Sequence, residues 1–215
     1  DGSRADMGGY PYLNTFVGPV WYVDSTNGSN ITGTGSSFNA FANIGPAIRF
    51  AADGDSINVA AGTYVENVDF DGKNLKLVGV DREATIIDGG GSGSVVTITN
   101  GETSAVLSGF TLQNGSATTY GGAIYCSSTS PILSDIIISN NSATNGGGIA
   151  CILNSSPSLK DVKIINNTSS ENGGGMYCQW TPNMTLKNVS IINNSAVFNG
   201  GGMYCIDSSD PELTN

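Results

Sequence analysis

The chain has 215 residues, a formal net charge of −10 and a pI near 4.1, and only 12% of its residues are charged. With just eight lysines and arginines it lacks the basic stripe that binds phosphate backbones, so a nucleic-acid partner is not expected. It also has no run of about 18 apolar residues that could span a membrane, and no basic segment followed by an apolar stretch at its start.

The N-terminal part divides into three pieces. Residues 1–20 show no periodicity and predict an extended lead-in. Residues 21–55 predict a short strand, a loop rich in Gly, Ser, Thr and Asn, and a helix over residues 41–52. The apolar face of this helix consists of Ile44, Ala47, Ile48 and Ala51. A short amphipathic helix directly before a solenoid is suited to cap its first coil.

Residues 56–215 are repetitive, and four cysteines mark the repeat most clearly. Each ends a similar phrase, such as Gly-Gly-Gly-Met-Tyr-Cys, and successive separations are 25, 27 and 27 residues. The four are Cys126, Cys151, Cys178 and Cys205. A period of this length is the signature of a solenoid, in which each repeat buries its apolar face against its neighbours.

Other columns keep the same period and define the secondary structure of each repeat. They are Leu107, Leu133, Leu159, Leu186 and Leu213; Leu112, Ile138, Ile164 and Ile191; and Asn114, Asn140, Asn166 and Asn193. Apolar residues alternate in runs of four to six between Gly, Asn and Pro, which predicts short strands and no helices. We therefore predict an all-β parallel β-helix of about six coils, open at its C-terminal end.

The asparagine column predicts a ladder inside the coil. If the leucines and isoleucines face inward, alternation places Asn140, Asn166 and Asn193 inward at a bend, where their amides would bond buried backbone groups. The residues after them would then adopt the left-handed conformation. These are Gly115, Asn141, Asn167 and Asn194.

The cysteines leave two alternatives open. Adjacent coils bring their Cα atoms within the range of a disulfide, and two disulfides would fit an oxidising compartment. However, each cysteine follows an inward Ile or Met by two residues, which favours a ladder of free, buried thiols. A metal site is not expected, because histidine is absent and the cysteines lie in a line.

Inward cysteines would place the residues before them on the outer surface. Tyr125, Tyr177 and Tyr204 then form an outward stripe, with Trp180 in the adjoining turn. Sugars stack on such rings, which makes these four residues a candidate carbohydrate-binding site. The alternative is that the tyrosines stack on one another as ordinary sheet-surface pairs.

The C-terminal end carries no cap. The last unit stops after Leu213, so we expect either that the natural protein continues or that another chain covers this end. Asp207, Asp210 and Glu212 lie in this terminal unit and predict solvated acids or a weak calcium site; no other cofactor is expected.

Two groups of motifs resemble known families. The phrases Trp-Tyr-Val-Asp (residues 21–24), Gly-Asp-Ser-Ile (54–57) and Ala-Gly-Thr-Tyr (61–64) resemble the start of many secreted bacterial β-helices of the pectin-lyase-like superfamily. The Asn-Asn-Ser and Gly-Gly-Gly-Ile/Met repeats are similar to those of chlamydial polymorphic outer-membrane proteins. The resemblance implies a right-handed parallel β-helix and an extracellular or cell-surface location. It does not imply an activity.

The start of the chain adds an expectation about assembly. Residues 1–8 resemble a phrase found at the end of such β-helices. The resemblance therefore implies that residues 1–20 cover the open last coil of a neighbouring subunit, head to tail, or that the chain was cut from an array.

Active relatives would need clustered acids with His, a Lys or Arg base beside calcium ligands, or paired Asp with Arg and Gln. The eight cations are Arg4, Arg49, Lys73, Lys76, Arg82, Lys160, Lys163 and Lys187. We expect none of them to lie among several aspartates of neighbouring coils, although Lys160 and Lys187 share a column flanked by Asp135 and Asp161. We therefore assign no catalytic residue and expect a non-catalytic structural or adhesive module. The alternative is a glycan-binding β-helix, or a lyase or glycoside hydrolase acting on acidic polysaccharides.

Overall fold

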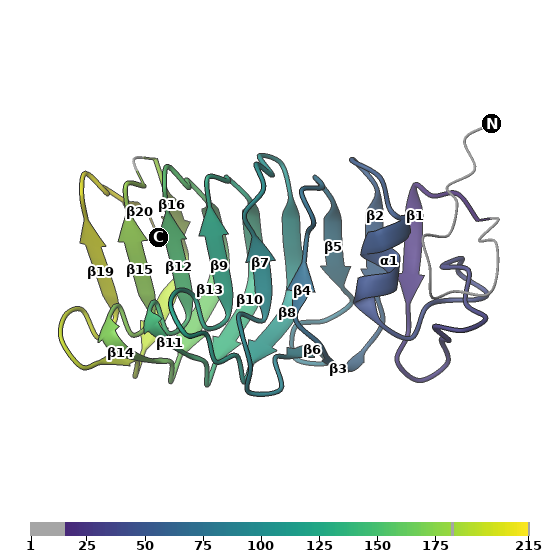
Figure 1. Cartoon of the computed structure of the whole chain (residues 1–215), viewed down its shortest axis with the longest axis horizontal. Coiled ribbons are helices and arrows are strands. Elements are labelled where there is room, and N and C mark those ends of the chain that lie inside the picture. Colours follow the sequence, from purple (N-terminus) through teal and green to yellow (C-terminus); the bar gives the residue numbers. More distant parts are fainter. Residues whose placement is uncertain (1–15, 182, 215) are drawn as a thin grey trace.

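The computed structural model describes residues 16–181 and 183–214, which form a right-handed parallel β-helix of about six turns. Its strands stack along the long axis of the molecule, with β1 and α1 at one end and β19 and β20 at the other (Figure 1). Within this part of the chain α1 (Ile44–Phe50) is the single helix, and none is long and apolar enough to cross a membrane.

Three parallel sheets form the walls. The largest has eleven strands: β1 (Val20–Val23), β2 (Ser56–Val59), β3 (Gly62–Val65), β5 (Lys76–Gly79), β6 (Thr85–Asp88), β8 (Val106–Gln113), β10 (Ile132–Ser139), β13 (Ser158–Ile165), β16 (Thr185–Lys187), β17 (Ser190–Ile192) and β20 (Glu212–Thr214). The second has six: β4 (Val68–Asp69), β7 (Val96–Ile98), β9 (Ile124–Ser127), β12 (Ile149–Ile152), β15 (Met176–Gln179) and β19 (Met203–Ile206). The third has three: β11 (Ser142–Asn145), β14 (Thr168–Asn172) and β18 (Ser195–Ala196).

Successive coils are in register, so equivalent side chains lie above one another. Leu133 of β10 pairs with Leu107 of β8 on one side and with Leu159 of β13 on the other. All three side chains are fully buried. Because a strand alternates sides, a shift of one residue would expose this column, and the buried leucines therefore fix the register.

The long strands β8, β10 and β13 each bend at one residue with a left-handed backbone. These residues are Gly109, Asp135 and Asp161, with φ of 79°, 54° and 57°. Pairing between β10 and β13 skips this position, passing from Ser134 and Lys160 directly to Ile136 and Val162. Gly and Asp tolerate this conformation better than most residues. The bend leaves the carboxylates of Asp135 and Asp161 outside the core, on adjacent coils.

The predicted asparagine ladder is wrong by one residue. Asn140, Asn166 and Asn193 have φ of 57°, 57° and 53° and are exposed, while the next residues, Asn141 and Asn167, are buried. A left-handed residue interrupts the alternation of a strand, so the bend residue points outward and its successor inward. The ladder is therefore formed by Asn141, Asn167 and Asn194, joined by amide hydrogen bonds of 2.9 and 3.0 Å.

The N-terminal end is covered by its own chain. The backbone of β1 exchanges hydrogen bonds with Gly35 and Phe41 of the following loop, and β1 pairs with β2. Helix α1 is shorter than predicted, and its first N–H groups are capped from a distance by Glu66, which accepts bonds of 2.8 and 3.0 Å. Val20, predicted in the lead-in, belongs to β1, and Phe16 packs against Trp21. Residues 1–15 lie outside the described residues.

Candidate functional site

The four cysteines form an in-register ladder of free thiols, with three members buried and Cys205 half-buried. A hydrogen bond with Cys126, together with burial, raises the pKa of the Cys151 thiol. A hydrogen bond with Cys205, together with burial, raises the pKa of Cys178, and the same contact lowers the pKa of Cys205. Since the thiolate is the reactive form, the buried members of the ladder behave as packing residues.

The terminal acids Asp207, Asp210 and Glu212 are all exposed. Asp207 accepts a 2.8 Å hydrogen bond from Gln179 of the previous coil. Among residues 16–181 and 183–214 no group of three or more His, Cys, Asp or Glu side chains is arranged to hold a metal ion. These acids therefore stand as separate surface groups.

The tyrosines form a ladder on the outer face of the six-stranded sheet. Tyr120 fills the place that Ala150 leaves in the column, with ring centroids 5.9 Å from both Tyr125 and Tyr177, and Tyr177 lies 6.0 Å from Tyr204. The expected exposed stripe is wrong for Tyr177, which is only 6% exposed. Because Tyr120 and Tyr177 each have another tyrosine ring on both sides along the axis, sugars would meet mainly the ring edges of these two residues.

Tyr120 was missed in the sequence because it stands outside the column of residues preceding cysteine. The signal that could have found it is the alanine at position 150, a gap that the large neighbours on both sides would leave unfilled. The fourth proposed residue, Trp180, is exposed and has a φ of 53°. The preceding coil presents Leu153 in the equivalent turn, also exposed and also left-handed, with a φ of 53°.

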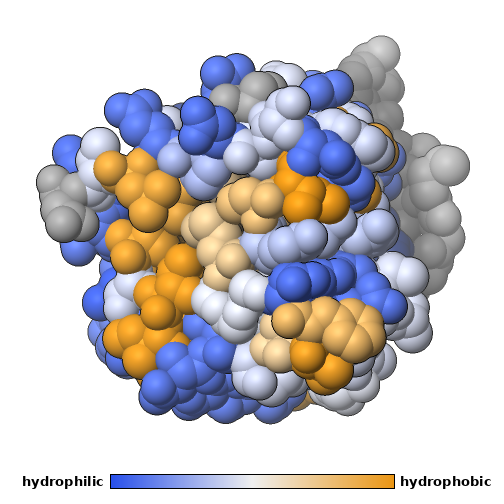
Figure 2. All heavy atoms as spheres, turned by 90° about the vertical axis from the view of Figure 1, so that its left-hand side faces the viewer, coloured by the Kyte–Doolittle hydropathy of each residue, from blue (hydrophilic) through white to orange (hydrophobic). Residues whose placement is uncertain are grey.

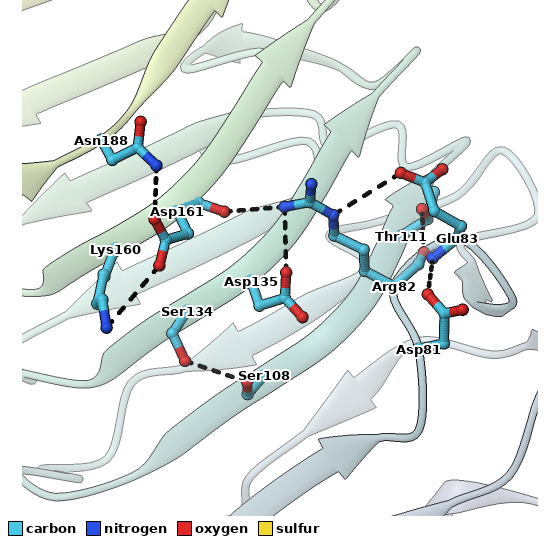
Figure 3. A network of polar contacts seen from close by, with 10 residues as sticks. All are labelled: Asp81, Arg82, Glu83, Ser108, Thr111, Ser134, Asp135, Lys160, Asp161 and Asn188. Carbon is cyan, nitrogen blue, oxygen red and sulfur yellow. Dashed lines mark hydrogen bonds and ion pairs between the residues drawn. The ribbon is translucent and has the colours of Figure 1, made fainter.

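A polar groove lies on a different face, where Arg82 reaches from the loop between β5 and β6 across to β10 and β13 (Figure 3). Its Nη1 lies 3.1 Å from Asp135 Oδ1 and donates a 3.2 Å hydrogen bond to the Asp161 carbonyl oxygen. Asp161 in turn accepts a 2.6 Å hydrogen bond from Asn188. The expectation that no cation lies among aspartates of neighbouring coils is therefore wrong for Arg82.

This cluster could not be predicted from the sequence because Arg82 is 79 residues from Asp161. The bends at Asp135 and Asp161 turn these residues toward the loop that carries Arg82. The groove has a volume of about 460 Å³ and is also lined by Lys163 and Ser190. Arg82 and Asp135 side chains are 34% and 55% exposed, so their ion pair contributes at most about 1 kcal/mol to stability. The charged groups of this groove are therefore only partly buried, which makes the groove a candidate site for a polar ligand.

The C-terminal end face carries exposed apolar side chains among polar ones (Figure 2). Figure 2 looks onto this end and shows hydrophobic residues spread across it. The exposed large apolar residues of the last coil are Ile192, Val197, Phe198 and Leu213. Strands β17, β18, β19 and β20 each pair with one strand of the preceding coil, and their other edge has no pairing partner among residues 16–181 and 183–214.

Comparison with solved structures places this architecture among known folds. The chain matches pectin methylesterase PemA from Erwinia chrysanthemi with a TM-score of 0.50 and 15% identity, over 80% of this chain and 66% of that one. The chain has the pectin-lyase-like β-helix fold. A pectin methylesterase from Aspergillus niger matches over 92% of this chain and 89% of its own, with 14% identity and a TM-score of 0.42. At these identities the likeness concerns the fold.

Within this β-helix, residues 135–152 match the Chlamydia polymorphic membrane protein repeat. That segment runs from the bend at Asp135 through the ladder residue Asn141 to the strand β12 that carries Cys151. Residues 135–152 therefore include strand and ladder residues that contact the preceding and the following coil. A comparison with curated proteins gives no significant match.

Proposed function

We propose that this β-helix is a non-catalytic structural or adhesive module of a secreted or cell-surface protein, and that its last coil joins it to a neighbouring β-coil. The observation that supports this most is the difference between the two ends. The first coil is covered by its own loop and by α1, whereas the last coil leaves apolar side chains and strand edges exposed. Exposed edges of this kind are templates for strand addition.

Head-to-tail assembly requires a segment that can reach the next subunit. Of the lead-in, Val20 already pairs with Ser56 and Phe16 packs against Trp21 of the same chain. Residues 1–15 are therefore the segment that we propose to cover the last coil of a neighbour. Burial of each large apolar side chain on that coil would contribute about 1.5–3 kcal/mol to the contact.

Self-association tests this proposal. We expect the chain to associate as its concentration rises in sedimentation velocity, and we expect the double variant Phe198→Lys/Leu213→Lys, or deletion of residues 1–15, to leave monomers. Both substituted side chains are more than two-thirds exposed, so the variant should still fold. Ile132→Lys, at an exposed apolar residue on the side wall, is the matched control and should associate normally. A chain that remains monomeric at every concentration would contradict head-to-tail assembly.

A second candidate function is glycan binding in the polar groove, favoured by the placement of Arg82 between Asp135 and Asp161. Here we expect Arg82→Gln to weaken binding of acidic oligosaccharides about tenfold, the worth of one charge-assisted hydrogen bond, measured by isothermal titration calorimetry. Arg49→Gln, which removes an exposed cation of α1 that does not line the groove, should bind as the wild type does. Unsaturated product or released methanol in the same samples would instead indicate an enzyme, and unchanged binding by Arg82→Gln would exclude this groove.

A further inference from the structure

The glycine turns are linked by backbone hydrogen bonds that all run in one direction. The N–H groups of Gly146, Gly147 and Gly148 donate to the carbonyl oxygens of Asn172, Gly173 and Gly174 in the next coil, over 3.0 to 3.1 Å. One coil later, Gly173, Gly174 and Gly175 donate to Asn199, Gly200 and Gly201, over 2.9 to 3.0 Å. Each turn thus presents three donors toward the C-terminal end and accepts from the turn before it.

The last glycine turn (residues 200–202) has the same three backbone N–H donors, but they form no hydrogen bond within the described chain. Its carbonyl oxygens accept from the preceding coil, but its three N–H groups have no acceptor among the described residues. The inner asparagine ladder ends in the same way: the N–H of Asn167 donates to Asn194 Oδ1 over 2.9 Å, whereas the N–H of Asn194 has no acceptor in the described part. Four donors therefore point out of the end face.

A second asparagine ladder runs beside the turn with the opposite direction. Asn172 Nδ2 donates to Asn145 Oδ1 over 3.0 Å, and Asn199 Nδ2 donates to Asn172 Oδ1 over 2.8 Å. Asn199 Oδ1 is thus left as an acceptor next to the row of donors. The end face therefore has a fixed pattern of donors and acceptor, and it repeats the contacts that link the turns of residues 145–148, 172–175 and 199–202 to one another.

Steric room at the glycines points to the same conclusion. A Cβ atom on Gly147 would lie 2.2 Å from the carbonyl oxygen of Thr168, and one on Gly174 would lie 2.3 Å from that of Ser195, both in the following coil. At Gly201 and Gly202 the nearest atoms to a Cβ are 3.1 and 3.5 Å away, and neither residue has a left-handed backbone. Within the described chain a Cβ on Gly202 makes only an ordinary contact and one on Gly201 a single tight contact, whereas a following coil would exclude a Cβ at both positions.

We propose that the glycine turn of residues 200–202 is the docking site for a further coil of this same repeat. That coil places successive carbonyl oxygens over the three glycine N–H groups and an asparagine Oδ1 over the N–H of Asn194. The half-exposed core residues Ile191, Met203 and Cys205 then meet their equivalents, which fixes a parallel, in-register contact. This inference rests on the part of the proposed function in which the last coil joins a neighbouring β-coil, and it adds the chemistry by which that coil is recognised; cover by residues 1–15 of a neighbour is a separate arrangement.

An extended chain tests the contact. A second copy of residues 189–215 joined after residue 215 continues the 27-residue period and supplies one further coil. We expect amide hydrogen exchange at Asn194 and residues 200–202 to slow about 100-fold, because these donors become bonded inside the stack. The melting temperature should rise in parallel.

Gly201→Ala is the discriminating variant. In the original chain its methyl group would lie 3.1 Å from the Asn194 carbonyl oxygen, a single tight contact that a shift of a few tenths of an ångström relieves, so the melting temperature should change by no more than about 2 °C. In the extended chain the methyl group would meet backbone of the added coil, as at Gly174, and both the exchange protection and the rise in melting temperature should disappear. Protection that survives Gly201→Ala would overturn this turn-to-turn contact while leaving coil docking intact. An extended chain with no protection at all would overturn the docking site itself, whereas head-to-tail self-association is decided separately by sedimentation.

Discussion

Replacing Asn167 with alanine is expected to destabilise the β-helix by about 4 kcal/mol, since several buried polar groups lose their partners at once. Asn167 is fully buried, and its Oδ1 accepts from both the N–H and the side-chain amide of Asn141, over 3.0 and 2.9 Å. Its Nδ2 donates to the carbonyl oxygen of Ile138 over 3.0 Å and to Asn194 Oδ1 over 3.0 Å. Urea unfolding followed by circular dichroism would measure the loss.

The neighbouring residue provides the control. Asn166 is exposed and left-handed, so Asn166→Gly keeps the backbone conformation and removes no buried hydrogen bond. We expect it to change the free energy of unfolding by about 0.5 kcal/mol or less. Equal effects of the two substitutions would contradict the assignment of the ladder to Asn141, Asn167 and Asn194.

This ladder shows how far local pattern predicts the coil. The period and the alternation of apolar residues predict the parallel β-helix, because both follow from stacking identical units in register. The asparagine column also marks the bend. The prediction placed the inward asparagine one residue too early because it assumed that side chains keep alternating through Asn140. The left-handed backbone of Asn140 interrupts that alternation, so the next residue points inward. A pair of adjacent asparagines does not reveal which of the two takes that conformation.

The polar groove and the tyrosine ladder were harder to predict for a different reason. Arg82 meets Asp135 across 53 positions of sequence, and Tyr120 enters the column from a turn of an earlier coil. Neither residue keeps the repeat period, so neither has an equivalent one coil away that would mark it. Contacts made by residues that depart from the repeat depend on the bends and loop lengths of individual coils, which spacing alone does not encode.

Glycine runs were interpreted from the sequence as turn punctuation, yet Gly147 is required for a different reason. Its backbone is not left-handed, so alanine there costs no conformational strain. Its Cβ would nevertheless lie 2.2 Å from the Thr168 carbonyl oxygen and 2.6 Å from that of Gly174. Because both contacts are to backbone atoms held in the stack, we expect Gly147→Ala to destabilise the fold by about 3 kcal/mol, measured by urea unfolding.

Gly54→Ala separates this packing effect from backbone strain. Gly54 has a φ of 86°, but a Cβ there meets nothing within 4 Å. Alanine at this position should therefore cost only the strain of a left-handed residue, about 1 kcal/mol. If Gly54→Ala lowered the free energy of unfolding as much as Gly147→Ala, glycine would be needed in this β-helix only for its left-handed backbone conformation. If Gly147→Ala is the more damaging, the distance between coils sets the requirement, and the same requirement would apply to any coil that docks on residues 200–202.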